Sequence, residues 1–321
     1  MTNARNGITA AITRLWQTDK PLTAVGLLML VALAGSVAGL WLDPRVITGA
    51  PAWLKPAKFA VSIAIYTLTL AWVFTYLPAW RRTRRIVGWT SAVVFVLELV
   101  IIDLQAWRGT TSHFNVGTPM DAILFSVMGA AIVVQTLSSV AVAVALWRQQ
   151  FADRAIGWAL RLGLTLTILG AFTGGLMTRP TETQLAEARA TGRIAIAGAH
   201  TVGAADGGTG IPGTGWSREH GDLRVPHFIG LHALQVLPLV LLAVGRRTAA
   251  ERARVQLVMV TTASYASLYG ILLWQALRGQ SLIAPDAVTA VALLAWAVAT
   301  AAVIWRVASR ASRRTLHPAM C

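Results

Sequence analysis

Histidines and carboxylates gather in one stretch of this chain, residues 199–235. Neutral imidazole is the commonest metal ligand among side chains, and two imidazoles at one depth of a helix bundle can also hold a haem iron. Four of the six histidines lie in this stretch and a fifth lies elsewhere beyond an apolar segment, so the candidate ligands are His113, His200, His220, His227 and His232. This set predicts a bound metal ion (iron, copper or zinc) or a haem b.

The spacing of two of these histidines limits how they can share a ligand. His227 and His232 are predicted to lie on the outermost turns of one helix. Five residues at about 100° each place their side chains about 140° apart, unlike the i, i+4 pair of helical zinc motifs. Gln235 follows His232 by three residues and is expected to orient it from the same helix face. We expect His113, His227 and His232 to form the site, with His200 or His220 completing it.

Two carboxylates lie within a single apolar segment, at Glu98 and Asp103. An ionised carboxylate at the centre of a bilayer costs on the order of 3 kcal/mol, so Glu98 is expected to be protonated, paired or next to water. Asp103 follows about one and a half helical turns later. Lys58, at the start of a neighbouring apolar segment, is a candidate ion-pair partner. These three side chains predict a site that moves or balances protons, and the alternative is a structural ion pair that fixes helix packing.

Cationic side chains on the same side of the predicted bundle could hold an anionic substrate or a lipid headgroup. The candidates for substrate binding are Lys58, Arg108, Arg224 and Gln235. For each arginine the alternative is an ion pair with an acid such as Asp222.

Long apolar segments must position all of these residues. Hydrophobic residues make up 55% of the 321 and charged residues 13%, which is typical of an integral membrane protein. About 20 consecutive apolar residues cross a hydrocarbon core as a helix. Eight segments meet this length, at 22–41, 58–77, 86–106, 119–147, 155–177, 227–244, 255–277 and 287–304. The sequence predicts an all-α integral membrane protein, a bundle of about eight transmembrane helices forming one polytopic domain over residues 1–321.

Basic residues mark the expected cytoplasmic side. The short connections near 78–86, 147–155 and 245–254, together with the two ends of the chain, hold 18 lysines and arginines against three acids, which accounts for the formal net charge of +15. Lysine and arginine are retained in short cytoplasmic loops, so both termini are expected in the cytoplasm of a bacterial-type inner membrane. Because this placement explains the basic composition, no nucleic-acid partner is expected; the expected partner is the lipid bilayer.

The opposite side carries the long connection 178–226, an extracytoplasmic loop between the fifth and sixth predicted helices. Connections of this length are uncommon unless they bind something or are disordered. A short amphipathic helix is expected over 183–196. A glycine-rich segment follows over 203–215, and its glycines permit backbone conformations that other residues rarely adopt.

Two functions remain open for such a protein. The first is a membrane oxidoreductase or electron-transfer protein, whose outward histidines bind a metal ion or haem while Glu98 and Asp103 move or balance protons. The second is a proton-coupled transporter or permease for a small-molecule or lipid-soluble substrate, in which Glu98, Asp103 and Lys58 form the coupling site and the outer loop is a gate. Chemistry gathered on one face favours the first, whereas a broken helix within a span would favour the second.

Overall fold

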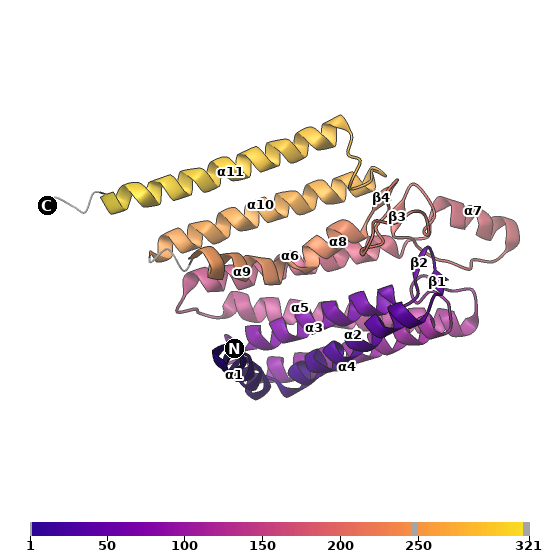
Figure 1. Cartoon of the computed structure of the whole chain (residues 1–321), viewed down its shortest axis with the longest axis horizontal. Coiled ribbons are helices and arrows are strands. Elements are labelled where there is room, and N and C mark those ends of the chain that lie inside the picture. Colours follow the sequence, from indigo (N-terminus) through magenta and orange to yellow (C-terminus); the bar gives the residue numbers. More distant parts are fainter. Residues whose placement is uncertain (1, 246–249, 317–321) are drawn as a thin grey trace. The chain divides into compact units, whose positions relative to one another are not determined.

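A computed structural model describes residues 2–245 and 250–316 of the chain (Figure 1). Residues 246–249 and 317–321, which belong to two of the predicted cytoplasmic segments, lie outside the described residues. The chain forms two compact units. Unit 1 comprises Met1–Ala145, Met177–Ala199 and Ala205–Gly215, and unit 2 comprises Leu146–Leu176, His200–Ala204 and Trp216–Cys321. The single-domain organisation stays a prediction.

Helices of membrane-spanning length dominate both units. Within the described residues, seven helices are long and apolar enough to cross a membrane, and the number is eight if one bent pair counts as a single span. This confirms a multi-pass chain of transmembrane-length helices. The sequence predicted one unbroken helix over 227–244. The structure has two helices there instead, α8 (Arg224–Leu231) and α9 (Ala233–Gly245), which meet at His232 with a bend of 50°.

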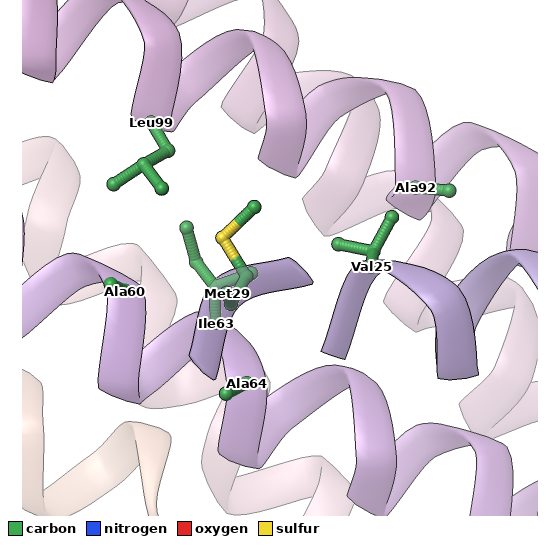
Figure 2. Close-up of a cluster of buried hydrophobic side chains, with 7 residues drawn as sticks. All are labelled: Val25, Met29, Ala60, Ile63, Ala64, Ala92 and Leu99. Atoms are coloured by element: carbon green, nitrogen blue, oxygen red, sulfur yellow. The ribbon is translucent and has the colours of Figure 1, made fainter. Parts of the chain in front are cut away.

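Unit 1 is built on five helices near the start of the chain. These are α1 (Thr2–Thr18), α2 (Lys20–Leu42), α3 (Leu54–Phe74), α4 (Arg81–Trp107) and α5 (Pro119–Arg148), of which α5 runs on into unit 2. Helices α2, α3 and α4 pack on one another around a buried cluster of seven side chains, shown in Figure 2: Val25, Met29, Ala60, Ile63, Ala64, Ala92 and Leu99. Four of the seven are small alanine or valine side chains, which let the helix backbones approach closely.

Short elements of unit 1 lie beyond the ends of these helices. Strands β1 (Val46–Ile47) and β2 (Ala50–Pro51) form a hairpin, and its two turn residues, Thr48 and Gly49, both have positive φ angles of 49° and 73°. A Cβ added to Gly49 would lie 2.6 Å from the carbonyl oxygen of Gly207, so the hairpin turn touches the glycine-rich segment.

The long connection contains helix α7 (Glu182–Thr191), which belongs to unit 1. A capping box between Thr181 and Gln184 begins this helix, and Gly192, in the left-handed conformation, ends it. The helix predicted over 183–196 is therefore present but shorter, because the chain turns at Gly192.

Unit 2 contains α6 (Arg154–Met177) up to Leu176, with α8, α9, α10 (Glu251–Leu277) and α11 (Ala287–Leu316). Helix α10 packs against α8, α9 and α11. A short antiparallel pair, β3 (Thr201–Val202) and β4 (Gly221–Asp222), precedes α8. Glycines let α6 and α8 approach to backbone contact, because a Cβ added to Gly170 would lie 2.5 Å from the carbonyl carbon of Gly230.

Candidate functional sites

Glu98 is a deeply buried acid of unit 1. It lies in α4, next to Leu99 of the buried cluster, and only 1% of its surface is exposed. Neither of its two carboxylate oxygens has a hydrogen-bond partner. Lys55 of α3 is the charged residue that acts on it electrostatically. Because buried carboxylates in folded proteins are normally hydrogen-bonded or paired, Glu98 calls for a functional explanation.

The other two members of the predicted proton site are arranged differently from expectation. Asp103, about 7.5 Å further along α4 by helical rise, also has a buried oxygen, Oδ1, without a hydrogen-bond partner. The Nζ of Lys58 donates to the carbonyl oxygen of Thr214 at 2.7 Å, so this lysine ties the glycine-rich segment to α3. Lys55, three residues earlier on the same helix, is not among the predicted residues but acts electrostatically on Glu98, and the role of Lys58 in the proton site stays a prediction. Residues three apart lie on the same face of a helix, so the position of Lys58 could have pointed to Lys55 as well.

His113 lies in the connection between α4 and α5 of unit 1, within a group of aromatic rings. Its ring centroid is 5.6 Å from that of Phe59 and 6.1 Å from that of Phe114, and its Nδ1 lies 3.1 Å from the Oγ of Ser112. The Nζ of Lys55 lies over the ring of Phe59, 6.0 Å from its centroid. Phe114 has a φ angle of 64°, a conformation that a bulky residue adopts only under strong packing constraint.

Arg108 forms an ion pair, which was the alternative to substrate binding. Its Nη1 lies 2.6 Å from Oδ1 of Asp121, which is buried at the start of α5. The same Oδ1 accepts from Gln105, and Oδ2 accepts from the hydroxyl of Thr118. A role for Arg108 in substrate binding stays a prediction, but its guanidinium already joins the ends of α4 and α5.

Three of the predicted histidines come together in unit 2. The Nδ1–H of His227 donates to the carbonyl oxygen of Gly170 at 2.8 Å, and His200 and His232 are near enough to act on His227 electrostatically. The ring of His232 lies 5.6 Å from that of Phe228. His220 lies between β3 and β4, where its backbone N–H donates to the hydroxyl of Ser217. His113 belongs to unit 1.

These histidines do not form a ready-made metal centre. Among residues 2–245 and 250–316, no group of three or more His, Cys, Asp or Glu side chains is arranged so as to hold a metal ion. The bound metal ion and the haem b therefore stay predictions.

Arg224 also forms the ion pair that the sequence offered as an alternative. Its Nη2 lies 2.6 Å from Oδ2 of Asp222, and Asp222 is only 2% exposed. The same carboxylate accepts from the backbone N–H groups of Ser217 and Arg224. Asp222 thus fixes the start of α8 together with the loop before it.

The break between α8 and α9 is repaired by a side chain from α6. A continuous helix would pair the carbonyl of Leu231 and the N–H of Leu234 within itself, but the bend at His232 separates them from those partners. The hydroxyl of Thr167 donates to the Leu231 carbonyl and accepts from the Leu234 N–H, both at 3.1 Å. The Oε1 of Gln235, three residues after His232, is buried without a hydrogen-bond partner. The bend is therefore a hydrogen-bonded element, with the partly buried His232 at its apex and Gln235 three residues further along in α9.

Comparison with family models, curated proteins and solved structures finds no match for this chain. The functional interpretation consequently depends on the chemistry of Glu98 in unit 1 and of the broken span in unit 2.

We predict that replacing Thr167 by valine, which has the same shape, destabilises the protein. Losing the hydroxyl leaves two backbone groups unpaired, at a cost of about 1–3 kcal/mol. The Thr167→Val variant should unfold at a lower temperature than wild type in detergent. Thr167→Ser, which keeps the hydroxyl, is the matched control and should stay close to wild type. Equal melting temperatures for the valine and serine variants would show that the hydroxyl does not hold the bend.

Proposed function

We propose that this protein is a proton-coupled transporter in which Glu98 takes up and releases the coupled proton. The observation that carries the proposal is the Glu98 carboxyl itself, which is buried within a span with both oxygens lacking a hydrogen-bond donor. Acids that only stabilise a fold are paired, as Asp121 and Asp222 are in this chain. An intramembrane acid without such partners is typical of proton relays.

Lys55 gives the protonation of Glu98 a mechanical consequence. When Glu98 is ionised, the positive charge of Lys55 on α3 attracts the carboxylate of Glu98 on α4. When a proton binds to a carboxylate oxygen, the negative charge disappears and so does this attraction. Proton uptake therefore loosens α3 from α4, and proton release draws them together. The unpartnered Asp103 oxygen, further along α4, lies on the expected path of the proton.

The broken span supports transport for a second reason. Many transporters bind their substrate where a spanning helix is interrupted, because the interruption presents polar groups at membrane depth. Here the α8–α9 bend has His232 at its apex, and the free carbonyl oxygen of Gln235 lies three residues further along in α9. We place the small-molecule or lipid-soluble substrate at this apex.

The orientation belongs to the same proposal. The excess of lysine and arginine in the short connections supports cytoplasmic termini in a bacterial-type inner membrane, with the connection 178–226 on the outer side. On this orientation the glycine-rich segment held by Lys58 is an outward gate.

A hydrophobic carbodiimide tests the state of Glu98, because such reagents couple to protonated carboxyl groups in apolar surroundings. We expect dicyclohexylcarbodiimide to label Glu98 of the reconstituted protein, and raising the pH should slow the labelling, as read by mass spectrometry of the peptides. Glu182, on the surface of α7, is the internal comparison, and Glu182→Gln should leave the labelling of Glu98 unchanged. Labelling of exposed acids without Glu98 would contradict the proposal.

A membrane oxidoreductase or electron-transfer protein is the second candidate, because His200 and His232 both lie within electrostatic reach of His227. These side chains would have to move to place a metal ion or haem iron between them, because the described residues contain no group arranged to hold a metal ion. Metal analysis and an absorption spectrum of the purified protein separate the two candidates. Stoichiometric iron with a Soret band, or stoichiometric copper or zinc lost in a His227→Ala variant, would favour the oxidoreductase. We expect metal below stoichiometric amounts and no Soret band.

A further inference from the structure

A basic cleft opens in unit 1 at the end of the bundle where α2 and α4 begin. Its volume is about 300 Å³, and its lining includes Asp19, Lys20, Arg81, Arg84, Arg85 and Trp89. Four cationic side chains thus surround one carboxylate. Retention of positive residues on one side of a membrane explains the sign of this charge. It does not explain why these side chains line one open cleft.

The one acid of the cleft is already engaged. Asp19 is only 8% exposed and caps α2, because its Oδ1 accepts from the N–H of Leu22 at 3.0 Å. Its carboxylate lies against Gly88 of α4, where an added Cβ would be 2.5 Å from Oδ2. Burial raises the pKa of the Asp19 carboxyl, while the Leu22 N–H and the charge of Arg84 lower it. One capping carboxylate cannot balance four cations.

The start of α4 breaks the usual rules for a helix N-terminus. The first turns of a helix favour acids and a side-chain cap, because the unpaired N–H groups make this end positive. Helix α4 has no acid in its first turn, its N-cap residue Trp80 makes no side-chain hydrogen bond, and its first five residues include four arginines. The Nε of Arg84 is also buried without a partner, although its Nη1 donates to the carbonyl of Phe74. An anion in the cleft would compensate all of these positive groups at once.

We propose that this cleft binds the phosphate of an anionic phospholipid headgroup. Its place at the start of two spans favours a lipid over a free phosphate, because the cleft is next to the hydrocarbon rather than out in solution. Trp89, two turns into α4, is 59% exposed, as expected of a ring at the level of the headgroups. Helix α1, which packs on α2, also exposes Ile8 (62%) and Trp16 (41%). Basic pockets between spans are known to hold anionic headgroups.

Lipid binding to the full-length purified protein, measured by native mass spectrometry, tests the assignment. The test variant is Arg81→Gln/Arg85→Gln, which removes two cleft cations and leaves Arg84 with its bond to Phe74. The matched control is Arg82→Gln/Arg252→Gln, which removes the same charge from exposed residues that do not line the cleft. We expect the dissociation constant for phosphatidylglycerol to rise about tenfold in the test variant and by less than about twofold in the control.

Three outcomes would overturn the proposal. An equal loss of phosphatidylglycerol in both double variants would mean that general surface charge, not the cleft, attracts the lipid. Binding of phosphatidylcholine as tight as that of phosphatidylglycerol would remove the requirement for an anion. Binding of glycerol 3-phosphate as tight as that of the lipid, with the same dependence on Arg81 and Arg85, would assign the cleft to a free phosphate instead. The melting temperatures of the two double variants are measured alongside. Equal values show that a difference in lipid binding does not arise from a difference in folding.

Discussion

Hydrogen bonding without water is the constraint on which this structure depends. Within a hydrocarbon core every polar group must find its partner inside the protein, because lipid tails offer none. At the bend between α8 and α9, Thr167 supplies the two bonds that the helix gives up. At Glu98 nothing supplies them. At the bend, the protein supplies hydrogen bonds to the backbone groups that the break leaves without helical partners. The Glu98 carboxyl receives no such bonds, which points to a function that requires an unpaired acid.

Three departures from local rules within the described residues can be given a chemical meaning. Glu98 is a buried acid without donors, His232 stands at a helix break, and α4 begins with cations where acids are favoured. Other buried acids are paired conventionally, as Asp121 is with Arg108 and Asp222 with Arg224. Proteins tend to violate local preferences at functional sites, and we interpret the three places as proton, substrate and lipid sites.

The sequence predicted the features that depend on composition and periodicity. Apolar length located the spanning helices, and the position of Glu98 within such a segment identified it before any contact was known. The helix break could not be predicted, because the hydroxyl that stabilises it belongs to Thr167, which lies 64 residues from Leu231 in the chain. The influence of Lys55 on Glu98 was not predicted either, and the bond of Lys58 depends on how the glycine-rich segment folds back to place the Thr214 carbonyl beside it. Contacts between distant segments decide such details, and one sequence does not encode them in any local pattern.

Infrared spectroscopy of the reconstituted protein during a pH titration tests the central claim most directly, because it observes the proton on Glu98 itself. We predict a carbonyl band of a protonated carboxylic acid in apolar surroundings that is absent from Glu98→Gln and that falls reversibly as the pH rises. A band that stays constant over the whole pH range in which the protein remains folded, or no difference between wild type and Glu98→Gln, would contradict a role for Glu98 in moving protons.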